Sequence, residues 1–250
     1  MQDFLSEISR KAGALALEYY KKGVKSSLKT SRLDLLTEAD IAVSKFLVNS
    51  IHEKYPDHHI YSEEMAEDIN SGAEYEWVID PIDGTWNFAN HIPNWGILIA
   101  VVERGVTKYA ATYWPVDDHL YTAEKGQGAF LNGEKIFVSN PSGLKNTAGH
   151  CSSPRPANGP RIKNAWIKLF ENETRHRNYA CMFNLILVSR GVHDYYVSNG
   201  GNDYDHLAPV LICEEAGAVV TNSFGEPWKR GMEDMVIAGP LLHPKILELF

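Results

Sequence analysis

The chain has 250 residues, a mass of 28.0 kDa, a formal net charge of −8 and a sequence pI near 5.7. This acidic balance argues against a general nucleic-acid binder, because binding to phosphate backbones needs clustered Lys and Arg. The longest apolar runs, such as residues 96–102, are far shorter than the roughly 20 residues that cross a bilayer. The N-terminus also lacks the segments of a signal peptide. We therefore expect a cytoplasmic protein without nucleic-acid or membrane partners.

The first third of the chain predicts helices followed by short strands. Apolar residues at three- and four-residue intervals indicate an amphipathic helix over residues 4–21 that ends near Gly23. A second helix is predicted from Thr37 to the residues before Pro56, which stops it. Alternation with turn residues then predicts a meandering sheet, with Asn132-Gly133 as a hairpin turn. Its expected strands are residues 60–62, 77–80, 95–104, 108–113, 120–123, 129–131 and 135–136.

The segment 140–160 is rich in Ser, Pro, Gly and Asn, and it is the best candidate for a boundary between two halves. Beyond it, helical and strand patterns alternate, which predicts layered α and β elements. The expected helices are residues 161–170, 181–190, 204–216 and 244–250, and the expected strands are 194–197, 218–221 and 235–238. We expect one α/β (α+β) domain over residues 1–250, with halves 1–140 and 141–250.

The three cysteines, Cys151, Cys181 and Cys213, are an odd number without paired spacing. This pattern fits a reducing compartment and does not indicate a zinc cluster. We expect small buried apolar side chains.

The most informative motif follows the apolar run 77–79 and reads Asp80-Pro81-Ile82-Asp83-Gly84-Thr85. Two carboxylates at the end of a strand offer the oxygen ligands that magnesium prefers. Gly84 lacks a side chain, so the amides of Gly84 and Thr85 can approach an anion. The alternative is a turn that ends a strand, since Asp, Pro and Gly are also common in turns for purely conformational reasons.

The spacing of the two aspartates bears on the mechanism. Phosphatases that form an aspartyl-phosphate typically place the nucleophile two residues before the second Asp, whereas Asp80 and Asp83 are three apart. This spacing favours a metal-activated water as the nucleophile over covalent catalysis by Asp80.

Three further carboxylates are candidates for the same site. Glu63 ends a predicted strand, although it could equally be half of an exposed acidic pair with Glu64. Asp205 lies where a loop enters a helix, and its alternative role is helix N-capping, which Asp203 could provide instead. Asp40 follows Thr37 by three residues, and capping is the simpler interpretation of that spacing.

Taken together, these residues resemble the inositol monophosphatase family, within the superfamily that includes fructose-1,6-bisphosphatase and the phosphoadenosine phosphate phosphatases. Residues 77–88, WVIDPIDGTWNF, look like the family's first signature, and residues 204–217 are similar to its second, in which an aromatic-Asp pair opens a helix ending in Glu-Ala-Gly. Segments 34–40, 61–64 and 121–133 also correspond, so the resemblance spans nearly the whole chain. It implies a layered αβαβα sandwich.

The resemblance also implies roles for matching residues. The magnesium ligands would be Glu63, Asp80, the backbone carbonyl of Ile82, Asp83 and Asp205. Thr85, hydrogen-bonded to Asp40, would activate the attacking water together with Glu63, while the amides of Gly84 and Thr85 hold the phosphate. Lys29 matches a lysine near the metals. The family further implies two or three Mg²⁺ ions and a homodimer.

Departures from the family pattern concentrate where the leaving group would bind. Residues 179–182, Tyr-Ala-Cys-Met, replace a stretch of small residues; Val197 aligns with an acidic residue that holds sugar hydroxyls; and Tyr204 replaces the usual Trp. An apolar side chain facing a hydroxyl would leave that group unpaired, which places inositol phosphate in question. The basic run 175–177 could contact an anion, but a solvated helix entry is the simpler explanation.

None of the ten histidines, including His91 and His206, has a motif context that requires a general base, so we expect solvated or core roles for them. The predicted function is Mg²⁺-dependent hydrolysis of a small phosphate monoester, such as an inositol-1-phosphate-like or related sugar or polyol phosphate, without a covalent intermediate. Histidinol phosphate, fructose 1,6-bisphosphate and a nucleotide 3′-phosphate are the alternative substrates. A non-catalytic binding member of the family is the alternative from another class.

Overall fold

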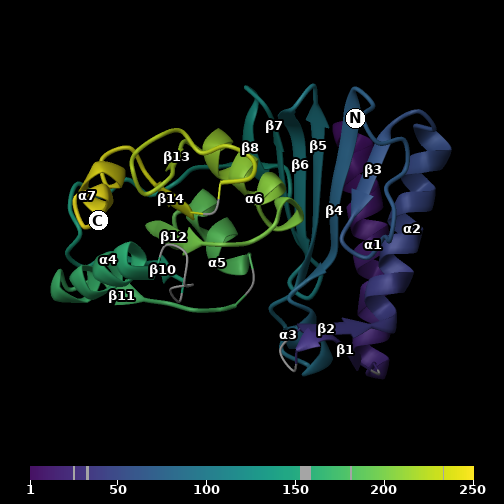
Figure 1. Ribbon diagram of the computed structural model, residues 1–250, viewed down its shortest axis with the longest axis horizontal. Helices are drawn as coiled ribbons and strands as arrows, with labels where there is room; N and C mark the ends of the chain where they lie inside the picture. Colours follow the sequence, from purple (N-terminus) through teal and green to yellow (C-terminus); the bar gives the residue numbers. More distant parts are fainter. Residues whose placement is uncertain (25, 32–33, 153–158, 181, 233) are drawn as a thin grey trace.

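The computed structural model describes residues 1–24, 26–31, 34–152, 159–180, 182–232 and 234–250. Two sheets alternate with three layers of helices in the order helix, sheet, helix, sheet, helix (Figure 1). Separate apolar clusters fill the spaces between successive layers. The layered αβαβα sandwich expected from the sequence is therefore confirmed.

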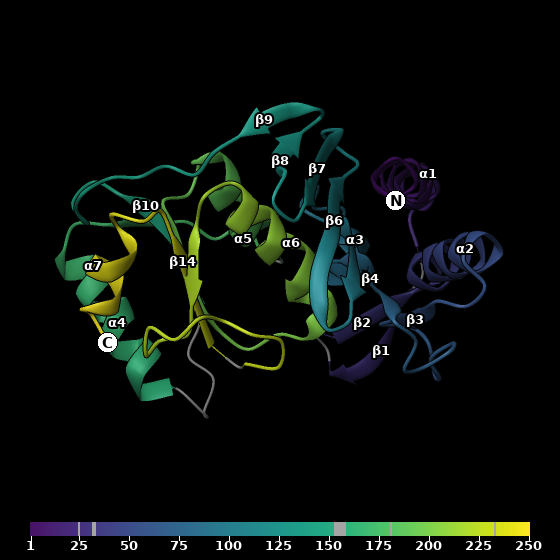
Figure 2. The same ribbon diagram turned by 90° about the horizontal axis from the view of Figure 1, so that it is seen from above.

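The first layer consists of α1 (Gln2–Lys22) and α2 (Glu38–Lys54), which lie side by side against one face of the larger sheet (Figure 2). Gly23 ends α1 with a positive φ of 76°, and Thr37 caps α2 by accepting the amide N–H of Asp40. A Cβ atom at Gly13 would lie 2.4 Å from the ring of Tyr113. Only glycine therefore lets α1 pack this closely on the sheet.

The larger sheet has seven strands that are neighbours in chain order, so the predicted meander is confirmed. The first two strands are parallel and the other pairs are antiparallel. Asn132 and Gly133 both have positive φ and form the predicted hairpin turn. The strands are β3 (His59–Ser62), β4 (Tyr75–Asp83), β5 (Gly96–Glu103), β6 (Val106–Trp114), β7 (His119–Glu124), β8 (Gly128–Leu131) and β9 (Glu134–Ile136).

The middle layer contains α5 (Phe183–Ile186), a 3₁₀ turn (Leu187–Arg190) and α6 (Asp203–Glu215). One side of this layer packs on the seven-stranded sheet and the other on a five-stranded sheet. The second sheet has the order β11 (Arg175–His176), β10 (Ala148–Cys151), β12 (Tyr195–Asn199), β14 (Asp234–Ala238) and β13 (Val219–Thr221). Its outer face is covered by α4 (Gly159–Glu171) and α7 (His243–Leu247).

Five short elements depart from the sequence-based expectations. A hairpin of β1 (Ser26–Ser31) and β2 (Asp34–Thr37) precedes α2, and α3 (Thr85–Ala89) follows the aspartate motif. Strand β10 lies inside the segment expected to be a boundary, and residues 175–176 form edge strand β11, where a helix entry was expected. Each is too short to produce a periodic pattern, and β10 and β11 are held by pairing with strands distant in sequence.

Cys151 and Cys213 are buried and unpaired, as expected, and burial raises the pKa of the Cys151 thiol to about 12. Cys181 lies outside the described residues. None of the helices in the described ranges combines the length and apolar character needed to cross a membrane.

Candidate active site

The two aspartates of the motif reach the same side of β4 because the strand contains a β-bulge. Asp80 pairs with Leu98 of β5 and Asp83 with Gly96, so the interval of three residues on β4 faces an interval of two on β5. In a regular strand, residues three apart point to opposite faces. The extra residue removes this alternation, and both carboxylates can face one site.

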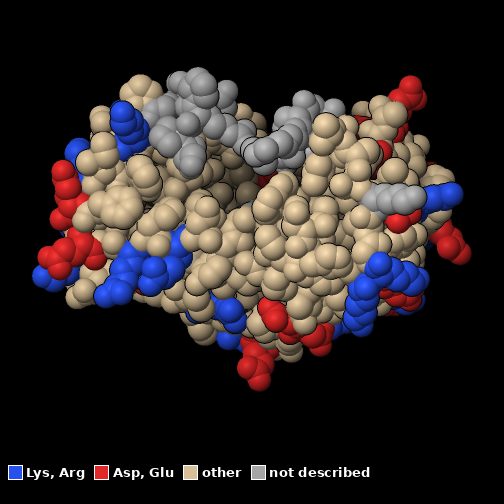
Figure 3. Space-filling model, turned by 90° about the horizontal axis from the view of Figure 1, so that it is seen from below, with Lys and Arg blue, Asp and Glu red and all other residues tan. Residues whose placement is uncertain are grey.

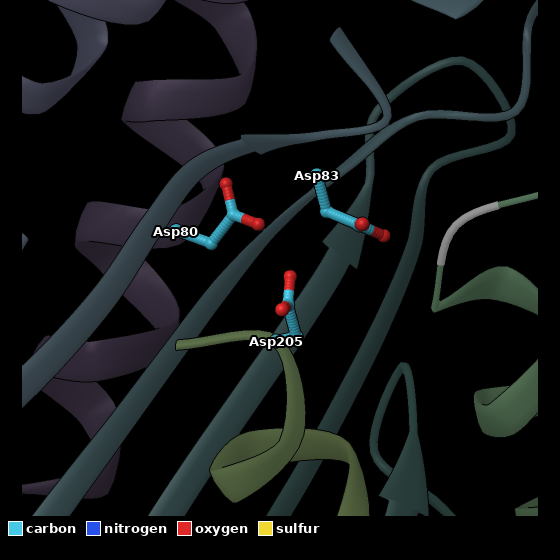
Figure 4. Close-up of side chains that lie close together, drawn as sticks. All are labelled: Asp80, Asp83 and Asp205. Carbon is cyan, nitrogen blue, oxygen red and sulfur yellow. The ribbon is translucent and has the colours of Figure 1, made fainter. Parts of the chain in front are cut away.

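Asp205 joins these two carboxylates from the first turn of α6, on the other side of the site (Figure 4). One carboxylate oxygen from each of Asp80, Asp83 and Asp205 lies within 4.8 Å of the other two. Asp80 and Asp83 are almost fully buried. The convergence expected from the sequence is thus present for these three residues.

A backbone N–H group orients each of the three carboxylates. Ile82 donates to Asp80 Oδ1 at 3.0 Å, Met182 donates to Asp83 Oδ2 at 2.9 Å, and Asn202 donates to Asp205 Oδ2 at 2.6 Å. The N-cap of α6 is Asn202, and Asp205 is the N3 residue of its capping box, so the alternative role of Asp205 as the N-cap itself is not what the structure has. Bonds of this kind fix the direction of metal ligands and are needed for affinity.

The electrostatics of the cluster favour a cation. Burial is the main cause that raises the pKa of Asp80 well above its usual value, and the charges of Glu63, Asp83, Asp205 and Asp40 raise it further. Glu63 is thus close enough to act on Asp80, and it lines the same cleft as Asp83 and Asp205. The donor set consists of oxygen atoms, which suits Mg²⁺.

The hydrogen bond expected between Thr85 and Asp40 is present. Thr85 Oγ1 lies 3.0 Å from Asp40 Oδ1 and also 3.0 Å from the carbonyl oxygen of Ile82. Asp40 is fully buried, and its Oδ2 accepts the amide and the hydroxyl of Thr37 in a capping box. One carboxylate therefore caps α2 with one oxygen and holds Thr85 with the other.

Gly84 and Thr85 line a cleft of about 720 Å³ together with Glu63, Asp83 and Asp205. Gly84 adopts a left-handed conformation (φ 88°, ψ 38°) at the start of α3, which favours glycine at this turn. The surface is hollowed on the face seen from below (Figure 3). The cleft runs from the carboxylates to the five-stranded sheet, so residues from both sheets contribute to it.

An ion-pair network fixes the start of α6 relative to β4. Arg230 donates to Asp203 of α6 at 2.5 Å and to both carboxylate oxygens of Glu76 of β4 at 2.5 and 3.1 Å. Because Asp203 is two residues before Asp205, this network helps to set the position of Asp205 beside Asp80. Neither Arg230 nor Met182 carries a local sequence signal, since both act only through the tertiary structure.

The three residues expected on the substrate side, Val197, Tyr204 and Lys29, have different positions in the structure. Val197 is fully buried in the cluster beneath α4 and α7, and its neighbours Tyr196 and Ser198 line the cleft. This corrects the expectation that Val197 faces a substrate, because alternate residues of a strand point to opposite faces. Tyr204 packs against the ring of Tyr61, with centroids 6.0 Å apart. Lys29 belongs to β1, but its side chain lies outside the described part of the structure.

The histidines have several roles. His206 is buried with its ring edge-on to Trp228, and His91 contacts the ring of Tyr20, so these two follow the expectation. His150 and His176, however, line the cleft. His150 has no sequence signal, because β10 was not predicted, whereas His176 lies in the basic run 175–177, for which contact with an anion was the less simple interpretation.

Comparisons with known proteins agree with this architecture. The family model described as "Inositol monophosphatase family" matches residues 1–250. Among curated proteins, the fructose-1,6-bisphosphatase/inositol-1-monophosphatase of Thermotoga maritima is 30% identical over 99% of this chain and 94% of its own length. The Nus factor SuhB of Escherichia coli is 33% identical over 87% of this chain and 83% of its own length.

Solved structures show the same fold. The Thermotoga maritima IMPase has a TM-score of 0.87 and 30% identity, covering 99% of this chain and 95% of that one. The extragenic suppressor protein suhB of Bartonella henselae has a TM-score of 0.91 at 24% identity, covering 99% of this chain and 96% of that one. The chain belongs to the inositol monophosphatase family.

Proposed function

We propose that this protein is a Mg²⁺-dependent phosphatase that hydrolyses a small phosphate monoester by direct attack of water, without a covalent intermediate. The observation that carries the proposal is the convergence of Asp80, Asp83 and Asp205 beside a cleft that Asp83 and Asp205 line together with Glu63 and Thr85. In this proposal, residues 1–140 provide most of the metal and phosphate site, and residues 141–250 provide Asp205 and the leaving-group pocket. On the family resemblance alone, the proposal extends to a cytoplasmic homodimer.

Two or three Mg²⁺ ions would be held by Glu63, Asp80, the carbonyl of Ile82, Asp83 and Asp205. The residues fit such ions, because a positive charge between carboxylates that are buried and repel one another stabilises their charged forms. When bound, Mg²⁺ neutralises charge on the phosphate and lowers the pKa of a water molecule.

The geometry of Thr85 suggests how a proton leaves the water. The hydroxyl has one hydrogen but two acceptors at 3.0 Å, Asp40 and the Ile82 carbonyl. If the carbonyl serves a cation, the hydrogen points to Asp40, and a lone pair of Thr85 Oγ1 can accept a proton from the water. As the proton of the water moves to Thr85 Oγ1, the hydroxyl hydrogen of Thr85 moves to Asp40. The water oxygen bonds to phosphorus, the P–O ester bond breaks, and the alcohol takes a proton from solvent.

A panel of phosphate monoesters with and without Mg²⁺ tests the proposal, together with Thr85→Val. We expect the wild type to release phosphate only with Mg²⁺, and Thr85→Val to lower kcat by about 10²-fold or more, the usual scale of a lost proton-transfer group. Thr122→Val is the matched control, since Thr122 is a half-buried residue of β7 that does not line the cleft. Full activity of Thr85→Val, or activity without a divalent cation, would contradict the proposal.

A binding role is the second candidate. It is favoured by relatives that are named Nus factor SuhB and not as enzymes. A purified protein that releases no phosphate from any ester on the panel, while still folded and binding Mg²⁺, would support this candidate.

A further inference from the structure

A second cavity, of about 300 Å³, lies between α6, the turn that joins β5 to β6 and the loop between β13 and β14. Among the described residues, none lines both this cavity and the active-site cleft. Its volume is at the lower end of the range of pockets that hold small organic ligands. The second cavity is therefore separate from the cleft and has room for a small molecule.

Much of its lining is apolar. Leu207, Val210 and Leu211 lie on one face of α6, because residues three and four apart in a helix are neighbours. Val102 and Val106 line the cavity from the adjacent strands β5 and β6. Contact with these side chains removes apolar ligand surface from water, so the cavity favours a ligand with an apolar body.

The loop between β13 and β14 adds positive charge. Trp228, Lys229 and Arg230 all line the cavity. Lys229 is exposed and forms no ion pair with any described residue. Arg230 donates one N–H to Asp203 and two to Glu76, and a guanidinium has five. With respect to the described part of the chain, the Lys229 ammonium and two N–H groups of Arg230 are thus available to an anion.

The other end of the cavity is balanced in charge. The carboxylate that lines it, among the described residues, belongs to Glu214, and Lys125 lies 3.8 Å from that carboxylate. Arg230 binds Asp203 in the first turn of α6, whereas Glu214 is in the last turn, eleven residues later, which is about 16 Å along a helix. An anionic group should therefore bind near Arg230, with the rest of the ligand along α6.

We infer that the second cavity binds a small carboxylate with an apolar body, that Lys229 and Arg230 hold its carboxylate, and that its occupation weakens Mg²⁺ binding at the aspartates. Arg230 provides the coupling, because it holds Asp203 two residues before Asp205. A bound carboxylate competes with Asp203 for the guanidinium and so loosens the position of Asp205. The coupling rests on the proposed function, whereas the binding site itself does not.

The first test uses metal-free protein, so that no cation in the cleft can bind the probe. Isothermal titration calorimetry compares 3-phenylpropionate with 3-phenylpropionamide, which lacks the charge, and with acetate, which lacks the apolar body. We expect 3-phenylpropionate to bind at one site per chain, about tenfold or more tightly than either of the others, the scale of a hydrogen bond to a charged group. Failure of 3-phenylpropionate to bind, or binding no tighter than that of the other two, would overturn this inference.

Two lysine variants locate the binding. Lys229→Met keeps the length of the side chain and removes its charge, and we expect it to weaken binding of 3-phenylpropionate by about fivefold or more. Lys163→Met makes the same change at an exposed residue of α4 that does not line the cavity, so it should keep the wild-type affinity. Undiminished binding in Lys229→Met, or an equal loss in both variants, would overturn the assignment of the cavity.

The second test measures the coupling. We expect saturating 3-phenylpropionate to raise the Kd of the wild type for Mg²⁺ by about fivefold or more, within the usual range for two coupled sites. Acetate at the same concentration, which controls for complexes of Mg²⁺ with the carboxylate, should leave this Kd unchanged. An equal Kd with 3-phenylpropionate and with acetate would overturn the coupling. If the wild type bound no Mg²⁺ in either condition, the proposed function and the coupling would both be contradicted, while the first test would still decide the binding site.

Discussion

Asp83→Asn is expected to abolish phosphate release, with kcat/KM falling at least about 10²-fold, the scale of losing one group that stabilises charge in a transition state. The substitution keeps the size of the side chain and the oxygen that can accept the Met182 N–H group. It removes one negative charge from a cluster whose oxygens lie within 4.8 Å. The effect should therefore arise from weaker cation binding, and not from misfolding. Initial rates of phosphate release, taken over a range of substrate concentrations at several Mg²⁺ concentrations, are the measurement.

The control for this prediction is Asp117→Asn, which makes the same chemical change at an exposed turn between β6 and β7. Asp117→Asn should retain wild-type activity at every Mg²⁺ concentration. A fully active Asp83→Asn would refute the assignment of Asp83 as a metal ligand.

Asp80→Asn is expected to change stability in opposite directions with and without the metal. In the metal-free protein the pKa of Asp80 is raised, mainly by burial, so the folded state binds a proton more tightly than the unfolded state does. Stability then falls as pH rises from the unfolded pKa of about 3.9 through the raised folded pKa, and the full loss is present above it. The side-chain amide in Asp80→Asn does not titrate, so this variant does not lose stability in this way as pH rises. Without metal, Asp80→Asn should therefore unfold at a higher temperature than the wild type at neutral pH.

With Mg²⁺ bound, the wild type should instead unfold at a higher temperature than Asp80→Asn. A ligand at 100 times its Kd stabilises the folded state by about 2.7 kcal/mol, which is about 5–10 °C in Tm for a chain of this size. Asp80→Asn should lose most of this increase because one ligand is gone. Thermal unfolding in EDTA and in Mg²⁺ at neutral pH measures both effects. If Mg²⁺ raised the Tm of both proteins equally, Asp80 would not be a metal ligand.

The sequence predicted those elements that have long, regular patterns. The period of α1 and the alternation of the strands from β4 to β9 are local signals, and both were confirmed. Strand β10 has only four residues, one of them Gly149, whose Cβ would lie 2.4 Å from the carbonyl oxygen of Tyr195. Such a strand is stabilised by its pairing with neighbouring strands, so no local sequence pattern predicts it.

The same distinction applies to the candidate site. Asp80 and Asp83 stand in one short motif, and Asp205 opens a helix with a recognisable signature, so the sequence was sufficient to find them. The substrate side depends on strand register, where an error of one residue exchanges the two faces of a strand. Val197 was expected in the cleft, and Ser198 lines it. The hydrogen bond from Met182 joins segments 99 residues apart and has no local signal.

The central claim is that Asp80, Asp83 and Asp205 hold a divalent cation in the cleft. Anomalous diffraction from crystals of the wild type soaked in Mn²⁺, a substitute for Mg²⁺, tests it most directly. We expect an anomalous peak among these three carboxylates, within coordination distance of at least one oxygen of each, and a weaker or absent peak in Asp83→Asn. A fully soaked crystal without a peak there, or with an undiminished peak in Asp83→Asn, would contradict the claim.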